Sequence, residues 1–361
     1  MSTLATNAIT DASGGNTATI NGYTPTMSNM AGRNRLINSD MRIDQRNAGA
    51  VVTNNGYAVD RFLGFRDGST VALTFQQSTT APAGFVNSMV VTTTTSGTAG
   101  SGEGVGFQQR IEGLNISDLG WGTANAKTVT LSFWVRSSLT GTFSGSLGNS
   151  AFNRSYPYTY TISSANTWEQ KSITIAGDTT GTWLTTNGIG IRVYWDMGSG
   201  TSLKGTAGSW ASSGYVGATG TTNLVGTNGA TFYITGVQLE VGSVATPFEN
   251  VDYSEMLRRC QRYYWQSFTT GAPQSTPIVP ILTANAERFG LPISQVQMRA
   301  TPTAISFNAS GTAGFVTEFS SGISRTISSI NPSYAGGGGY AQTTVSPTNS
   351  IQVAVSYSAE L

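Results

Sequence analysis

Apolar and polar side chains alternate along ten short segments between residues 59 and 241, and the segments are bounded by Gly, Asn, Asp and Ser. This period of two puts every second side chain on one face, as in a β-strand that buries half of its surface. Strands at this spacing are typical of an all-β sandwich. The segments span residues 59–67, 70–78, 87–95, 104–112, 127–138, 141–147, 157–163, 168–177, 188–198 and 231–241.

The last of these segments indicates how the sandwich closes. Apolar and polar side chains alternate from residue 231 to 241, except at Gly236, between Ile234 and Val237. A glycine at such a break predicts a β-bulge. The strand pattern stops after residue 241, so we interpret this segment as the closing strand and the exit from the main domain.

Residues 252–266 carry the one helical pattern. Leu257, Cys260 and Tyr264 fall on one face at helical spacing, and Ser254 stands where an N-cap is expected. The sequence beyond residue 269 returns to β signals, with early prolines that confine strands to edges or bends. The fold class is therefore expected to be all-β, with a β-sandwich, one linking α-helix and a smaller C-terminal β domain. The expected divisions are an N-terminal arm at 1–32, the sandwich at 33–250, the linking helix at 251–268 and the C-terminal β domain at 269–361.

Charged residues make up only 10% of the chain, against roughly 25% in ordinary soluble domains, and the net charge is +1. A nucleic-acid-binding surface needs a dense basic patch, so we expect no nucleic-acid partner. The chain has no histidine and one cysteine, Cys260, which excludes Ser-His-Asp and Cys-His catalytic groups and an internal disulfide. No run of about 18 apolar residues is present, so we expect no membrane insertion.

Residues 1–32 consist largely of Ser, Thr, Asn, Gly and Ala, with isolated apolar residues. Such a segment buries too little apolar surface to offset its own ordering entropy. We interpret it as an arm that docks on another protein of a larger assembly. The alternative is an arm that wraps around its own domain.

Carbohydrate binding by stacking requires exposed aromatic faces with amides or carboxylates nearby, and seven tryptophans supply candidates. Some lie in or beside a long glycine-rich loop at 198–229, and another follows a Gly-Asp-Thr-Thr-Gly turn. The candidate glycan platform consists of Trp183, Trp195, Asp196, Trp210 and Tyr215. The alternative is that these side chains plug the open edge of the sandwich. Trp134 and Trp168 lie within alternating strands and are expected in the core, whereas Trp121, between two glycines, is open to either interpretation.

Hydrolysis of a polysaccharide requires two carboxylates at a defined separation. The acidic residues of the expected sandwich are isolated in the sequence, and no two share a motif. These residues are Glu103, Glu112, Asp118, Glu169, Asp178 and Asp196. We therefore expect a non-enzymatic protein.

A structural calcium ion requires clustered oxygen ligands, and the start of the sandwich offers Asn38, Asp40 and Asp44 as candidates. The alternative is internal ion pairing of the two aspartates with Arg33, Arg42 or Arg46. Neither an EF-hand spacing nor a phosphate-binding loop occurs, so we expect no other cofactor.

Three parts of the chain resemble a known group of proteins, over about residues 33–266. They are NRLINSDMRIDQRNAG with YAVDRF, VTLSFWVRSSLTGTFSGSL with RSYPYTYTISSANTWEQKSITI, and FYITGVQLEVGSVATPFE with SEMLRRCQRYY. They look like bacteriophage tail-fibre and head-fibre structural proteins, and they also resemble jelly-roll carbohydrate-binding modules. The resemblance implies a jelly-roll sandwich in a virion surface protein, a homotrimer, and a role in adsorption.

We therefore expect a non-enzymatic virion fibre or spike subunit that adsorbs to a host-surface glycan and contacts other virion proteins through residues 1–32. Single glycan sites of low affinity become effective when several are linked on one particle. One alternative is a capsid decoration or cement protein that bridges shell subunits without a glycan site. The other is a polysaccharide depolymerase.

Overall fold

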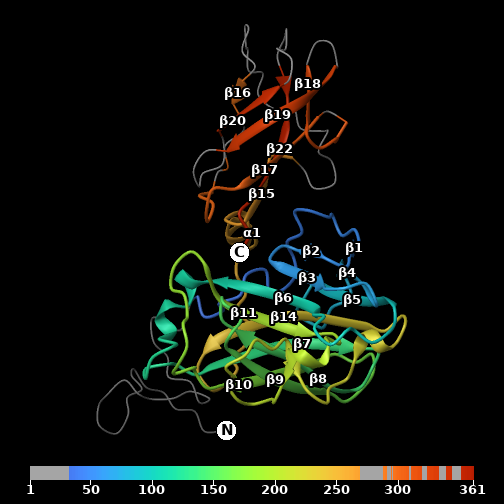
Figure 1. Ribbon diagram of the computed structural model, residues 1–361, viewed down its shortest axis with the longest axis vertical. Coiled ribbons are helices and arrows are strands. Elements are labelled where there is room, and N and C mark those ends of the chain that lie inside the picture. The colour runs from blue at the N-terminus through green and yellow to red at the C-terminus, as the bar shows by residue number, and fades with distance from the viewer. Residues whose placement is uncertain are drawn as a thin grey trace, which may run out of the picture.

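The computed structural model of the protein describes residues 32–268, 288–290, 294, 296–308, 310–318, 323–332, 339–343 and 351–361. The expected arm, apart from Gly32, lies outside the described residues, and so do the first strands expected after residue 269. Figure 1 shows a larger β body and a smaller β domain that projects from it, with the C-terminus at their junction.

Two antiparallel six-stranded sheets form the body, and we name them sheet I and sheet II. In spatial order, sheet I consists of β1 (Val52–Thr53), β4 (Ala72–Ser78), β5 (Ser88–Thr95), β14 (Thr231–Val241), β7 (Val129–Ser137) and β10 (Glu169–Ile175). Sheet II consists of β2 (Gly56–Val59), β3 (Phe62–Arg66), β6 (Val105–Glu112), β11 (Ile189–Asp196), β8 (Gly141–Gly148) and β9 (Ser155–Ile162). Each of the ten alternating segments contains one of these strands, so the predicted jelly-roll β-sandwich is confirmed.

The core lies between the two sheets, where every second side chain of the central strands points inward. Leu131, Phe133 and Val135 of β7 are fully buried. From sheet II, the ring of Phe107 stacks on Trp195 with 5.1 Å between centroids. Burial of these large apolar side chains is the main source of stability for a sandwich of this kind.

A β-bulge interrupts β14 at the predicted position. The pairing of β14 with β7 shifts register between Thr235 and Gln238. Gly236 has φ +61°, and a Cβ atom there would lie 2.5 Å from Cζ of Phe85 and 3.1 Å from Cδ1 of Trp134. Only glycine fits this bend, because a side chain would meet the left-handed backbone and two aromatic rings at once.

The long loop after β11 is ordered against the sandwich. It contains the 3₁₀ turns η3 (Thr201–Leu203) and η4 (Leu224–Gly226), and the short strands β12 (Lys204–Gly205) and β13 (Gly217–Ala218) pair in parallel. The loop is tied to the body by the backbone, since the N–H of Ala211 donates to Ser155 O at 2.8 Å and that of Gly97 donates to Val225 O at 2.8 Å. Two further 3₁₀ turns, η1 (Gly113–Asn115) and η2 (Ser117–Leu119), follow β6.

The one α-helix among the described residues is shorter than predicted. It is α1 (Tyr253–Gln261), and residues 264–266 instead form strand β15 (Tyr264–Gln266). The cap is Asp252 rather than Ser254, because Oδ1 of Asp252 accepts a hydrogen bond from the Ser254 N–H at 2.9 Å. Residues 264–266, directly after α1, pair with residues 356–358 near the C-terminus of the chain. This tertiary pairing determines their structure, although their spacing in the sequence is helical.

The C-terminal domain consists of two small antiparallel sheets. One contains β15, β22 (Ala354–Ser358) and β17 (Thr303–Phe307), in that order. The other contains β16 (Arg288–Gly290), β20 (Gly339–Thr343), β19 (Ser324–Pro332), β18 (Phe315–Glu318) and β21 (Ile351–Gln352). The buried cluster formed by its described residues includes Met298, Val316, Val355 and Tyr357, while Ile305 and Ile323 are exposed.

Buried charges fix the end of the chain to the sandwich. The Glu360 carboxylate pairs with the guanidinium of Arg61 and, at 2.8 Å, with that of Arg46. Arg110 of β6 donates to the Leu361 carbonyl. The C-terminal domain is therefore attached to the body at both of its ends, through α1 and through the last residues (Figure 1).

The carboxyl of Asp60 belongs to the same buried network. Burial raises its pKa to about 6, and the favourable charge of Arg46 only partly opposes this effect. A carboxyl that keeps its proton in the folded state up to about pH 6 stabilises the fold below its ordinary pKa near 4. That contribution is lost as the pH rises through 6.

We therefore expect a pH-dependent stability difference between the wild-type protein and Asp60→Asn. The free energy of unfolding of the wild type, relative to the variant, should fall by roughly 3 kcal/mol between about pH 4 and pH 7. Urea unfolding of both proteins across this range measures it, and the subtraction removes the titration of the other carboxylates. A difference that stays constant or grows with pH contradicts the prediction.

Candidate functional site

Trp195 and Asp196, two members of the predicted glycan platform, lie inside the protein. Trp195 is fully buried in the core. The Asp196 carboxylate accepts hydrogen bonds from the N–H groups of Gly198 and Ser199 at 3.1 and 2.7 Å and lies 3.3 Å from Nζ of Lys204. Placing them on an exposed platform is therefore wrong, because Asp196 instead holds the start of the long loop in place.

Trp183 and Trp210 pack with Trp121 at one end of the sandwich. The three rings meet edge to face, with centroids 4.8 to 5.4 Å apart. Their indole N–H groups are used internally: Trp121 donates to Lys127 O and Trp210 to Ala176 O, both at 2.8 Å. Trp183 is buried and Trp210 half-buried, so the plug interpretation describes this cluster.

Tyr215 is half-buried in the long loop. A Cβ atom on Gly205 would lie 2.3 Å from Cδ2 of the Tyr215 ring, so the ring covers the backbone of β12. Its carbonyl accepts a hydrogen bond from Ser146 Oγ at 2.5 Å. The five residues predicted as a glycan platform are therefore not brought together on one accessible surface.

The three calcium candidates make hydrogen bonds and an ion pair within the protein. Oδ1 of Asn38 accepts from the Ile43 N–H at 2.9 Å, and the two carboxylate oxygens of Asp44 accept from the N–H groups of Asn47 and Gly49 at 2.9 and 2.8 Å. Asp40 pairs with Arg42, as the ion-pair alternative predicted. Within the described residues, no group of three His, Cys, Asp or Glu could hold a metal ion.

Trp134 and Trp168, predicted to lie in the core, are instead half-buried on the outer face of sheet I. In β7 the inward positions are occupied by Leu131, Phe133 and Val135, so Trp134 necessarily points outward. Its register partners are Thr235 of β14 and Gln170 of β10, which therefore share its face. The core prediction for these two tryptophans is wrong.

Tyr233 brings the two tryptophans into one aromatic surface. It is opposite Arg136 in the sheet register, and the Arg136 guanidinium carbon lies 5.0 Å from the centre of its ring. Trp168, immediately before β10, packs edge to face on Tyr233 with 6.2 Å between centroids. Near the bulge, Phe85 and Phe248 pack edge to face at 5.1 Å, and Phe85 and Trp134 both lie against Gly236.

We name this surface the aromatic face. It comprises Phe85, Trp134, Trp168, Tyr233 and Phe248, together with Arg136, and all six side chains are half-buried. Polar groups border it, since Asn166 and Gln170 are exposed. The solvent side of an antiparallel sheet is normally polar, so a row of aromatic rings there indicates a contact surface.

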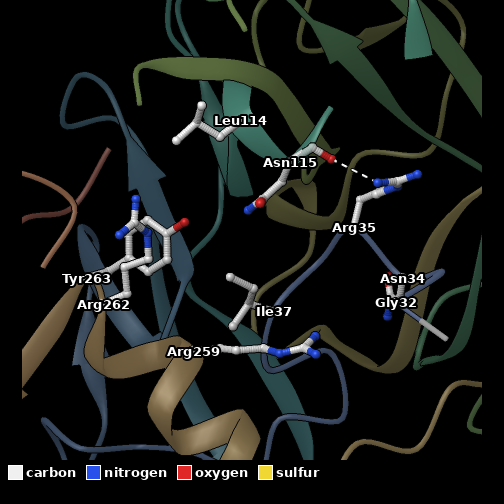
Figure 2. A pocket seen from close by; sticks show the side chains of 9 residues that line it. All are labelled: Gly32, Asn34, Arg35, Ile37, Leu114, Asn115, Arg259, Arg262 and Tyr263. Atoms are coloured by element: carbon white, nitrogen blue, oxygen red, sulfur yellow. Dashed lines mark hydrogen bonds between the residues drawn. The ribbon is translucent and has the colours of Figure 1, made fainter. Parts of the chain in front are cut away.

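A pocket of about 380 Å³ lies elsewhere, between α1 and the start of the described chain (Figure 2). Figure 2 shows Arg262 and Tyr263 on one side and Arg35 on the other. The arginines are already paired within the protein: Arg35 with Asp118 at 2.7 Å, Arg259 with Glu255 at 3.0 Å, and Arg262 with Glu112 at 2.6 Å. Tyr263 also donates to Glu112 at 2.8 Å, so these side chains hold the junction together and we assign no ligand here.

No helix in the described part of the chain is long and apolar enough to cross a membrane. Neither a family model nor a curated protein matches the sequence.

Solved structures share limited similarity with the sandwich. The active domain of tailspike protein 4 from bacteriophage CBA120 is 14% identical over 58% of this chain, with a TM-score of 0.29, and the match spans about a fifth (21%) of that protein. A xylan-binding CBM22 domain from Paenibacillus barcinonensis is 10% identical over 55% of this chain and 99% of its own, with a TM-score of 0.27. A putative sugar-binding protein from Bacteroides thetaiotaomicron is 14% identical over 58% of this chain and 100% of its own, with a TM-score of 0.29. The β-sandwich assignment rests on the strand pairing described above.

Proposed function

We propose that this protein is a non-enzymatic subunit of a phage fibre or spike and that its sandwich binds a host-surface glycan through the aromatic face. One observation carries the proposal, namely the row of Trp134, Tyr233 and Trp168 on the solvent side of sheet I. Sugar rings have C–H faces that pack on aromatic rings, and their hydroxyls bond to nearby amides. Gln170 and Asn166 supply such amides beside the rings.

The proposed virion role rests on the arrangement of the two domains. The C-terminal domain projects from the body and is anchored at its base, as expected of a part that meets neighbouring copies in a fibre (Figure 1). Among the described residues of this domain, the buried cluster is small, and Ile305 and Ile323 are exposed. Small cores commonly gain burial from oligomerisation, so we propose a homotrimer that presents several glycan sites together.

Replacement of the two central rings tests the glycan proposal. We expect the double variant Trp168→Ala, Tyr233→Ala to bind an immobilised glycan at least about 10-fold more weakly than the wild type, because it removes two stacking surfaces. A glycan array identifies the ligand, and surface plasmon resonance then measures the affinity of each protein for it.

The matched control is Tyr253→Ala, which removes an exposed ring on α1 that does not belong to the aromatic face. It should bind as the wild type does. If the double variant keeps full affinity, the aromatic face is not the glycan site. If the wild type binds no glycan and attaches only to assembled phage shells, the decoration-protein alternative replaces the proposal.

A further inference from the structure

We infer that the aromatic face selects an acidic sugar, one whose ring carries a carboxylate, and that Arg136 recognises this group. The inference rests on the proposed glycan function and adds the chemical class of the ligand. It starts from the position of one guanidinium among the rings.

Arg136 is held in a fixed orientation. Its guanidinium lies over the Tyr233 ring, 5.0 Å from the centroid, and its Nε donates to the Asn166 carbonyl at 2.9 Å. A stacked guanidinium that is also bonded at Nε loses little further entropy when its terminal nitrogens bind a ligand. Within the described residues, these terminal nitrogens make no ion pair with a carboxylate.

The charge of Arg136 differs in this respect from that of half of the arginines in the chain. Eight described arginines pair with carboxylates of the protein: Arg35, Arg42, Arg46, Arg61, Arg154, Arg258, Arg259 and Arg262. Arg136 is not among them, although it lies in the centre of a contact surface. A positive charge left without a partner between stacking rings favours an anionic ligand.

The acidic residues nearest to Arg136 along the strands bind other groups of the protein. The Glu169 carboxylate accepts from the N–H groups of Ser163 and Ser164, both at 2.9 Å, and pairs with Lys171 at 2.6 Å. Glu240, on the outer side of β14, is buried and accepts from Thr246 N at 2.8 Å and from Gln238 Nε2 at 2.9 Å. Neither carboxylate neutralises Arg136, so the charge is available to a ligand.

The geometry fits a carboxylated sugar ring better than a neutral one. A sugar ring stacked on Trp168, which packs edge to face on Tyr233, places its substituents toward the Arg136 guanidinium over the Tyr233 ring. Guanidinium and carboxylate form two parallel charge-assisted hydrogen bonds, which a neutral hydroxymethyl group cannot reproduce. The carboxylate should therefore account for about a 10-fold difference in affinity.

The experiment compares each acidic polysaccharide with its own carboxyl-reduced form. Alginate, polygalacturonate and hyaluronan serve as probes, alongside neutral xylan and dextran, and affinity electrophoresis of the full-length protein measures retention. We expect the wild type to bind at least one acidic polymer about 10-fold more tightly than its reduced form. Arg136→Gln should lose this preference while keeping the affinity for the reduced form.

Two controls separate a specific contact from net charge and from misfolding. Arg258→Gln removes the same charge from an exposed pair on α1, where the arginine side chain is 68% exposed, and should bind as the wild type does. Arg136→Lys keeps the positive charge but lacks the paired N–H donors of a guanidinium. It should therefore recover only part of the affinity for the acidic polymer. Thermal melting of each variant confirms that it is folded.

The outcomes distinguish this inference from the function on which it rests. Equal binding of the acidic and reduced polymers, or of Arg136→Gln and the wild type, overturns the inference and leaves the glycan proposal intact. Binding of the wild type to xylan or dextran, without binding to any acidic polymer, also overturns the inference and leaves the glycan proposal intact. If the wild type binds no polymer of the panel and no glycan on the array, both the inference and the proposed glycan function are overturned.

Discussion

Glu360→Gln is expected to lower the free energy of unfolding by about 3–5 kcal/mol, because it removes the carboxylate that pairs with the buried Arg61 guanidinium and leaves Arg46 with its pair to Asp60 alone. The Arg61 side chain is only 2% exposed, and Arg46 is nearly as well enclosed at 15%. The centre of the Tyr263 ring lies 3.6 Å from the guanidinium carbon of Arg61, and the centre of the Tyr264 ring lies 3.8 Å from that of Arg46. Stacking on these rings does not replace the charge of a carboxylate that is lost from a buried site.

Urea unfolding followed by tryptophan fluorescence measures this effect. The matched control is Glu255→Gln, which also removes one carboxylate from two arginines, Arg258 and Arg259, but at an exposed position on α1. Surface pairs contribute about 0 to 1 kcal/mol, so the control should be close to the wild type. Similar effects of the two variants would show that the buried pairs at the C-terminus add nothing beyond a surface pair.

Trp195→Ala should lower the free energy of unfolding by about 3–5 kcal/mol. The indole is fully buried and meets Phe107 at 5.1 Å, Phe133 at 6.0 Å and Phe62 at 6.3 Å between ring centroids. Its removal leaves a cavity in the centre of the core that rigid strands cannot close.

Trp210→Ala is the control, because this half-buried ring lies in the loop at the end of the sandwich and its removal opens no enclosed cavity. Chemical unfolding of both variants, beside glycan-binding measurements, tests the assignment. A Trp195→Ala protein with wild-type stability and no glycan binding would return Trp195 to the ligand platform. A greater loss of stability in Trp210→Ala would mean that the loop cluster, rather than the centre of the core, holds the sheets together.

The sandwich could be predicted from the sequence because alternation is a local property that survives folding. Each alternating segment contains a strand, and the break at Gly236 marks the bulge. The end of α1 could not be predicted in the same way. Tyr264 and Trp265 continue the helical spacing, but they pair with Ser358 and Tyr357, more than 90 residues later in the chain.

Two physical reasons explain why the sequence pattern does not predict the aromatic face. The outward position of Trp134 could have been read from its strand, because Thr130, Ser132 and Arg136 have the same parity and Phe133 has the other. Because tryptophan counts as an apolar residue in an alternation pattern, the pattern alone does not reveal that Trp134 shares the parity of the polar residues. The approach of Trp168 to Tyr233 depends instead on β7 lying between β10 and β14, an order of strands that local pattern does not encode.

The attachment of the C-terminal domain at both ends has a mechanical consequence. Its first strand, β15, and its last, β22, lie side by side in one sheet, and each continues directly into a segment fixed to the body. Tension applied to the projecting domain is thus divided between two routes. One is the covalent chain through α1, and the other is the set of ionic contacts around Glu360.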